Sequence, residues 1–219
     1  LEVSPDFIDY PFFADLGAVQ AAAVLRAAGH EVTLVDALAI PGASAERRGD
    51  RVALGAQPSS VVTQLPTDLD AAIVALSPFS VPPRRSSPVG AVLETLRGRS
   101  ATLPIVLADL HQGGQHVIDA SAAGVLASYP EASAYIKHEA EVALPAILAD
   151  SAWVDRGARE RRAISGEDPR TLDDLPLPAW DLVETGAYFR FHDAVIEALG
   201  RGRWAFPIDC ASLPALSSR

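Results

Sequence analysis

The feature that most constrains the fold is an alternation, through the first half of the chain, between two kinds of segment. Short aliphatic or β-branched runs alternate with longer segments rich in Ala and Leu. The short runs have the length of buried strands, and the longer segments have the length of connecting helices. Strands that alternate with helices form parallel sheets with helices on both faces. The sequence therefore predicts an α/β fold, a doubly wound, Rossmann-like parallel sheet of five strands.

The expected strands cover residues 1–4, 31–35, 70–76, 103–108 and 125–127. The expected helices cover residues 15–28, 89–97, 117–123 and 140–150. Residues 41–67 have no clear period and are expected to form a loop or a ragged helix. In a sheet of this kind the ligand crevice lies at the carboxyl ends of the strands.

A change of composition near Trp153 predicts a boundary. The chain becomes charged and then rich in proline, as in the stretch Leu-Pro-Leu-Pro-Ala-Trp at residues 175–180. Such a stretch lacks a core of its own. We expect one domain over residues 1–152 and an irregular linker over residues 153–219, packed on that domain or on something downstream.

Charge and cysteine content exclude several classes of partner. The net charge is −10, and the short basic run at residues 159–162 is expected to be solvated, so nucleic acid is not an expected partner. Cys210 is the only cysteine, which excludes an internal disulfide and a cysteine-based zinc site. No signal peptide and no run of about 20 apolar residues is found, so no membrane contact is expected and a cytoplasmic location is predicted. The chain has no Met and stops abruptly after Ser218-Arg219, which suggests a fragment. Methionines omitted from the sequence would also give a count of zero, and spacings would then be one residue short in places.

Two loops after expected strands are candidates for ligand binding. Ser77-Pro78-Phe79-Ser80 follows the third strand, and a segment with the pair Gly113-Gly114 follows the fourth. Adjacent glycines allow a bulky ligand to lie against the backbone, or they satisfy a loop that needs positive φ. His111 and His116 flank this pair and are either ligand contacts or surface residues, with no third metal ligand at a recognisable spacing.

A dinucleotide site is not expected. Asp36 ends the second expected strand, where an acidic residue contacts the ribose in dinucleotide-binding folds. However, the turn after the first strand lacks the G-x-G-x-x-G sequence that cradles the pyrophosphate. The chain also has no P-loop and no G-x-S-x-G nucleophile elbow.

Several segments form a set of motifs in a fixed order. Leu16-Gly17 is followed by Gly29-His30-Glu31-Val32 and Asp36, and then by Ser77 and Gly113-Gly114 after two expected strands. Nearer the C-terminus come the segments Tyr135 to Leu144, Leu172 to Trp180 and Leu213 to Arg219.

This order resembles the cobalamin-binding domain at the N-terminus of cobalamin-dependent radical SAM enzymes. The first segments are similar to the first helix and second strand of that family, and Ser77 and Gly113-Gly114 are similar to its S-x-L and GG elements. The last three segments are similar, in order, to a segment with G-E-G-E, to the D-L-P linker and to the stretch before R-G-C-P-x-x-C-x-x-C.

The resemblance implies a module that binds cobalamin and positions it for a radical SAM domain beyond residue 219. S-adenosylmethionine and a [4Fe-4S] cluster would belong to that downstream domain, and the reaction would be a methyl transfer or a cyclisation. No residue of this chain is expected to be catalytic or to bind a metal. The expected cofactor contacts are Ser77, Phe79 and Ser80 after the third strand, Gln112, Gly113, Gly114 and Gln115 after the fourth, and Tyr129, Pro130 and Glu131 after the fifth.

The chain departs from the family pattern in three places. The D-x-H-x-x-G loop is absent between Ser4 and Gly17, so base-off cobalamin with no lower axial histidine is expected. His138 and Ala140 replace both glycines of G-E-G-E, and Phe79 stands at the third position of S-x-L. Two alternatives therefore stay open. One is a domain of this type that has lost the cofactor and acts as a scaffold or binds a partner, and the other is the N-terminal half of a two-Rossmann-domain glycosyltransferase.

Overall fold

The computed structural model describes residues 2–3, 14–76, 87–110, 120–155, 159–167, 169 and 171–199. Its centre is a four-stranded parallel sheet in the order β4-β5-β6-β7. The strands are β4 (Ala72–Ala75), β5 (Ile105–Ala108), β6 (Ala134–Lys137) and β7 (Arg162–Ser165). All four residues of β5 are buried, as expected for a strand with neighbours on both sides and helices above and below.

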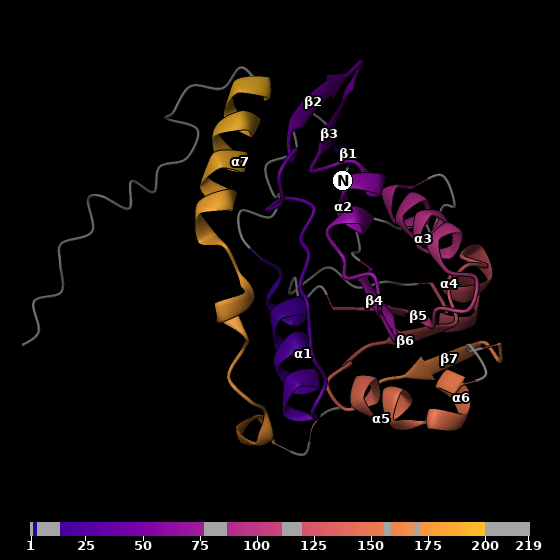
Figure 1. Cartoon of the computed structure of the whole chain (residues 1–219). Helices are drawn as coiled ribbons and strands as arrows, with labels where there is room; N and C mark the ends of the chain where they lie inside the picture. The colour runs from indigo at the N-terminus through magenta and orange to yellow at the C-terminus, as the bar shows by residue number, and fades with distance from the viewer. Residues whose placement is uncertain are drawn as a thin grey trace, which may run out of the picture.

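Helices cover both faces of this sheet (Figure 1). On one face, Ile105 and Leu107 pack against α2 (Pro58–Thr63), α3 (Pro88–Arg99) and α4 (Ala122–Ser128). On the other face, Val106 and Ala108 pack against α1 (Leu16–Ala27), α5 (Ala143–Ala149) and α6 (Ser151–Asp155). This alternation along β5 follows from the two-residue period of a strand. The α/β class and the parallel sheet between two helical layers are therefore confirmed.

The connection from β6 to β7 differs from the two before it. The β4–β5 and β5–β6 connections pass through α3 and α4 on one face, whereas the β6–β7 connection passes through α5 and α6 on the other. The strand order advances in the same direction throughout, so this last crossover has the opposite hand to the first two. Crossovers of one hand dominate known parallel sheets, which makes this connection unusual.

Local signals explain where the helices begin and end. Asp15 caps α1 by accepting from the backbone nitrogens of Gly17 and Ala18 at 2.9 and 3.3 Å, and Gly29 follows its end with a φ of 93°. Ser87 caps α3 in the same way through the nitrogen of Gly90 at 3.2 Å. The helices expected over residues 15–28 and 89–97 are confirmed.

A small antiparallel sheet stands beside the parallel one, in the order β1-β3-β2. Its strands are β1 (Glu2–Val3), β2 (Ala45–Arg48) and β3 (Arg51–Leu54). The strand expected near the N-terminus thus exists, but it pairs with β3 and not with the parallel sheet. The segment 41–67, expected to be a loop or a ragged helix, contains β2, β3 and α2.

Two expected strands are wrong, and the parallel sheet has four strands in the part of the chain that is described. Residues 31–35 make no strand, because Val32 and Leu34 pack their side chains against α1 while the backbone has no partner strand. Residues 125–127 lie inside α4, which Ser121 caps through the nitrogen of Gly124. The strand that follows α4 is β6, which overlaps the start of the G-E-G-E-like segment at Tyr135 to Leu144. Of the helix expected over 117–123, residues 117–119 lie outside the described residues, and α4 begins only at Ala122.

The segment expected to be an irregular linker contains regular structure. The strand β7 extends the parallel sheet beside β6, with Ala134 opposite Arg162. Two short 3₁₀ helices follow, at Leu172–Asp174 and Trp180–Leu182, and then α7 (Thr185–Leu199). Figure 1 shows α7 beside the small sheet, and its Tyr188, Phe191 and Val195 share a core with Val52 and Leu54.

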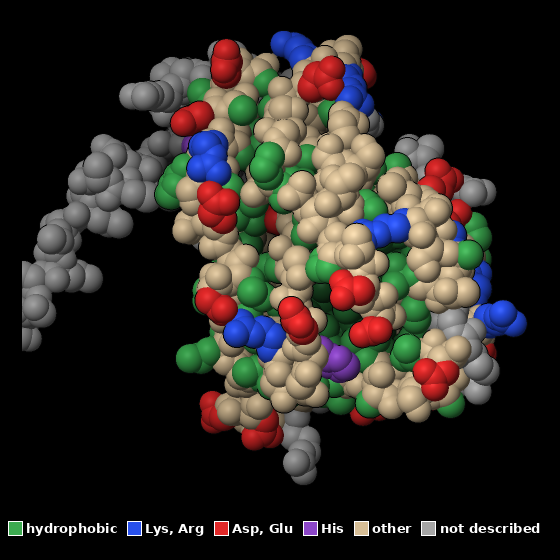
Figure 2. Space-filling view, viewed as in Figure 1, with side chains coloured by type: hydrophobic (Ala, Val, Ile, Leu, Met, Phe, Trp, Pro, Cys, Tyr) green, Lys and Arg blue, Asp and Glu red, His purple; other side chains and the backbone are tan. Residues whose placement is uncertain are grey.

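No helix among the described residues is long and apolar enough to cross a membrane. The charged side chains on the face drawn in Figure 2 are scattered, with Lys and Arg atoms in small groups separated by acidic and uncharged atoms.

Candidate functional site

The carboxyl ends of the four parallel strands meet at one edge of the sheet. Ala75 at the end of β4 lies opposite Ala108 at the end of β5, and the nitrogen of Leu76 donates to the oxygen of Ala108 at 2.8 Å. The segments that begin at Ser77 and His111 therefore leave the sheet from neighbouring strands. Ser77, Phe79, Ser80, Gln112, Gly113, Gly114 and Gln115 themselves lie outside the described residues.

Three polar side chains form a group near this edge, which we call the edge cluster: Asp109, Tyr135 and Lys137. Tyr135 lies opposite Leu107 in the sheet and packs in the core beneath α3 and α4. Asp109 and Lys137 each come two residues further along, and side chains two residues apart on a strand point to the same face. The nitrogen of Asp109 donates to the oxygen of Ile136 at 3.0 Å, which holds the end of β5 against β6.

Tyr135 is the unusual member of the edge cluster. Its side chain is 0% exposed, and its hydroxyl has no hydrogen-bond partner in the structure as described. Burial raises the pKa of this phenol, and the charge of Asp109 raises it further. The hydroxyl is therefore neutral at any physiological pH and keeps its proton to donate.

The side chain of Lys137 has a hydrogen-bond partner within the protein. Its Nζ donates to the backbone oxygen of Ala120 at 3.0 Å, just before α4. Its own backbone oxygen accepts from the nitrogen of Gly166 at 2.6 Å. A Cβ added to Gly166 would lie 1.7 Å from the oxygen of Glu139, so the chain after β7 approaches the turn after β6 as closely as a glycine allows.

His138, directly after β6, adopts a left-handed backbone conformation with a φ of 68°. It is the only non-glycine residue with positive φ in the described chain. Glycine adopts this conformation without steric cost, whereas other residues adopt it rarely. The side chain of His138 is exposed, and the next residue but one, Ala140, is buried against α5.

Tyr129, Pro130 and Glu131 lie at the other edge of the sheet, because they follow α4 and lead into the start of β6. The expectation that they follow a strand is wrong, since α4 occupies that position. Their backbone oxygens serve the fold: Arg161 donates to Tyr129 at 2.8 Å, and Arg97 donates to Glu131 at 2.5 Å. The Tyr129 hydroxyl lies 3.2 Å from the Oγ of Ser87, so the ring of Tyr129 links the end of α4 to the cap of α3.

Asp36 belongs to a separate buried contact. Its Oδ2 accepts from the hydroxyl of Tyr188 at 2.5 Å, and its Oδ1 accepts from the nitrogen of Leu38 at 2.9 Å. Burial raises the pKa of this carboxyl in spite of both hydrogen bonds. The residue that could have contacted a ribose in a dinucleotide fold thus holds α7.

Metal ligation gains no support from the described residues. Among them no group of three or more His, Cys, Asp and Glu side chains is placed to hold an ion. His111, His116 and Cys210 lie outside the described residues.

Sequence reasoning missed the edge cluster. The candidate loops follow expected strands and contain small residues, whereas Asp109, Tyr135 and Lys137 lie in or directly after strands. The one signal was a tyrosine within a run that becomes a buried strand, where a hydroxyl needs a partner.

Within the residues that the structure describes, the fold and the edge cluster define an α/β protein with a polar group at the carboxyl edge of its parallel sheet. Comparison with protein-family models, with curated proteins and with solved structures found no match to this chain.

Proposed function

We propose that this chain is a corrinoid-binding module that holds base-off cobalamin at the carboxyl edge of its parallel sheet. The observation that carries the proposal is the pairing of Ala75 with Ala108. It makes the S-x-L-like segment at Ser77 and the segment with Gly113-Gly114 leave from adjacent strands at one edge. In open α/β sheets this edge is where ligands bind.

The described residues near this edge fit such a ligand. The buried hydroxyl of Tyr135 lacks a partner and lies among apolar side chains, as suits a ligand that is largely apolar with few polar atoms. His138 has the backbone conformation of a glycine at the place where the resembling family has the first glycine of G-E-G-E. Cobalamin would supply the organometallic chemistry, and this chain would bind and orient it for a downstream radical SAM domain.

The direct test is retention of the cofactor. Purified protein incubated with hydroxocobalamin and then desalted should keep corrin absorbance at close to one equivalent. Replacing both Gly113 and Gly114 by Ala should lower the retained amount, because two Cβ atoms would stand where the ligand meets the backbone. The matched control is Gly98→Ala in α3, where an added Cβ meets nothing within 4 Å. A colourless wild-type protein after desalting would refute the proposal.

A scaffold without cofactor is the second candidate, and Ala140 favours it. Ala140 is 2% exposed and packs in the core beside α5. The resembling family has the second glycine of G-E-G-E at this position, so Ala140 departs from the pattern associated with the cofactor. If this candidate holds, neither the wild type nor the Gly113/Gly114 variant retains any corrin.

A further inference from the structure

We infer that α7 is a releasable strap over the small antiparallel sheet, that the contact of Tyr188 with Asp36 latches it, and that this latch weakens as the pH rises. None of the residues proposed to hold the corrinoid takes part, so the inference does not depend on the proposed function. Its physical basis is the way in which α7 is attached to the rest of the described chain.

The core beneath α7 is separate from the cores of the parallel sheet. It joins side chains of the helix to side chains of β3 and of the segment that leads into the small sheet: Tyr188, Phe191, Val195, Val52, Leu54 and Leu38. The two cores that flank the parallel sheet contain side chains of α1 to α6 and of the parallel strands. Release of α7 therefore uncovers the small sheet and leaves the packing of the parallel sheet intact.

The latch lies where two segments of the chain pass from α1 to the small sheet. The segment before Asp36 packs on α1, whereas Leu38 packs in the core beneath α7. The segment before α7 is likewise held on α1, where the nitrogen of Ala179 donates to the oxygen of Val19 at 3.3 Å. The hydroxyl of Tyr188, a residue that is 3% exposed, donates to Oδ2 of Asp36 at 2.5 Å and joins the two segments. Because the residues before α7 have their own contacts with α1, the helix can leave the small sheet without displacing them.

The carboxyl group in the latch makes its strength depend on pH. Closure of α7 shields Asp36 from water, which costs more free energy for the charged carboxylate than for the neutral acid. This burial raises the pKa of Asp36, although the hydrogen bonds from Tyr188 and Leu38 lower it. The charge of Asp15 at the start of α1 also raises this pKa, and that of the N-terminal amino group lowers it. Since the closed form binds the proton more tightly than the open form, closure is favoured most at acid pH. This advantage is lost as the pH rises through the raised pKa.

Hydrogen exchange of the ligand-free 219-residue chain, measured from about pH 4.5 to about pH 7.5, tests the latch. Protection factors correct for the pH dependence of the intrinsic exchange rate. They should fall with pH for amides of α7, by up to about tenfold per pH unit, the effect of one coupled proton. Amides of α7 should also be less protected than those of β5 at every pH, because the helix opens without the parallel sheet. Constant protection of α7 across the series, or protection equal to that of β5, would overturn the inference.

Three variants separate the latch from other titrations. In Asp36→Asn the pH dependence of α7 protection should disappear. Tyr188→Phe keeps the ring and removes the donor, so it should lower the protection of α7 about tenfold, the effect of one buried hydrogen bond. His192→Gln replaces a second titratable side chain, one turn after Tyr188 in α7, and should keep the wild-type pH dependence.

The inference fails if the pH dependence survives in Asp36→Asn, if it vanishes in His192→Gln, or if Tyr188→Phe leaves the protection of α7 unchanged. Should Asp36→Asn not fold, the wild-type, Tyr188→Phe and His192→Gln series decide the outcome.

Discussion

Asp36 shows how a single buried carboxyl makes stability depend on pH. It accepts hydrogen bonds from Leu38 and Tyr188, yet burial and the nearby charge of Asp15 keep its pKa above the ordinary value for Asp. The folded protein therefore binds the proton of Asp36 more tightly than the unfolded chain does.

We expect Asp36→Asn to flatten the fall in stability between acid and neutral pH. Because the folded pKa is raised, the contribution of Asp36 is complete below the unfolded pKa and is lost as the pH rises through the folded pKa. Asn cannot ionise, so this loss should vanish. Urea unfolding at a series of pH values measures the effect, and parallel pH profiles for variant and wild type would contradict it.

Gly17 marks a close contact between α1 and the edge of the sheet. A Cβ at this position would lie 1.7 Å from the backbone oxygen of Leu110, which follows β5. Gly17→Ala should lower the free energy of unfolding by about 1–3 kcal/mol or more, because backbone atoms must move. Gly98→Ala is the control and should raise stability by up to about 1 kcal/mol, since Ala suits a helix better than Gly. Thermal or urea unfolding measures both, and equal shifts in the two variants would contradict the contact.

At this scale the sequence predicts helix ends better than long-range contacts, as the helix expected over residues 15–28 shows. Gly29 as the end of α1 follows from local chemistry alone, and the structure has it there. The contact of Asp36 with Tyr188 joins residues 152 positions apart, and no local signal in the sequence reveals such a pair.

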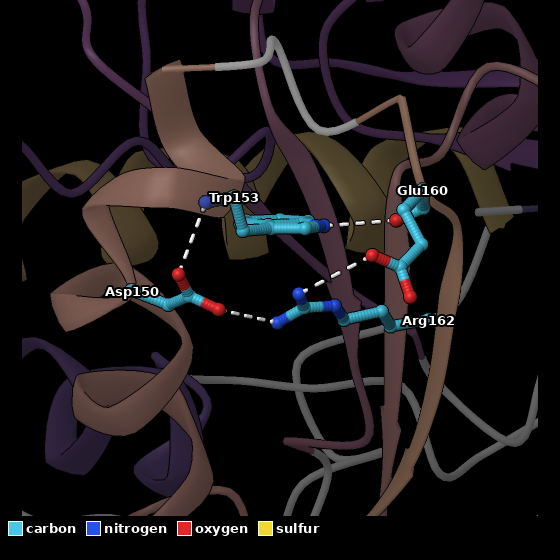
Figure 3. A network of polar contacts seen from close by, with 4 residues as sticks. All are labelled: Asp150, Trp153, Glu160 and Arg162. Carbon is cyan, nitrogen blue, oxygen red and sulfur yellow. Dashed lines mark hydrogen bonds and ion pairs between the residues drawn. The ribbon is translucent and has the colours of Figure 1, made fainter.

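The element that most extends the fold beyond expectation is β7, and a polar network holds it (Figure 3). Arg162 pairs with Asp150 at 2.8 Å and lies over the ring of Trp153, 5.6 Å from its centroid. Asp150 also accepts from the nitrogen of Trp153 at 3.0 Å. The network ties β7 to the start of α6.

Removing this tie should loosen β7 selectively. In Arg162→Met the ion pair and the stacked cation are lost while much of the apolar stem is kept, so backbone amides in β7 should exchange with solvent faster than in the wild type. Arg48→Met is the control, because Arg48 forms an exposed ion pair with Glu46 in the small sheet. Hydrogen exchange read by mass spectrometry distinguishes the two. Unchanged protection of β7 in Arg162→Met would contradict the role of the network.

Strands with continuous apolar runs were predictable from the sequence, whereas the outermost strand β7 was not. Four successive apolar residues, all buried, identify β5, and β4 is also a run of four apolar residues, although only Ala72 among them is buried. The strand β7 reads Arg-Ala-Ile-Ser with alternating exposure, which is too short and polar to distinguish from a loop. Residues 31–35 have the composition of a strand, but side-chain packing on α1 satisfies their apolar residues without a neighbouring strand.

Across the whole molecule, the last third of the described chain closes over the first helix. Arg26 in α1 pairs with Asp181 at 2.7 Å, and Gln20 donates to the oxygen of Pro176 at 2.9 Å. The nitrogen of Ala179 donates to the oxygen of Val19 at 3.3 Å. The segment expected to link two domains is thus packed along α1, and α7 continues from it to the small sheet.

In our proposal the ligand binds at the carboxyl edge of the parallel sheet. The edge cluster lies on the side of α3 and α4, while α1 and the segment along it lie on the other face. The order of motifs predicted a ligand site at the strand ends, but it did not indicate the buried Tyr135, because β6 was not recognised as a strand.

The most direct test of the central claim is the electron paramagnetic resonance spectrum of cob(II)alamin mixed with the 219-residue chain and passed through a desalting column. Free cob(II)alamin at neutral pH has its base on cobalt, and the axial nitrogen splits the signal. Our account predicts that the protein fraction retains the signal without nitrogen splitting, because the base is held away from cobalt and no histidine replaces it. A protein fraction without the signal, or one whose signal keeps the splitting of an axial nitrogen, would contradict it.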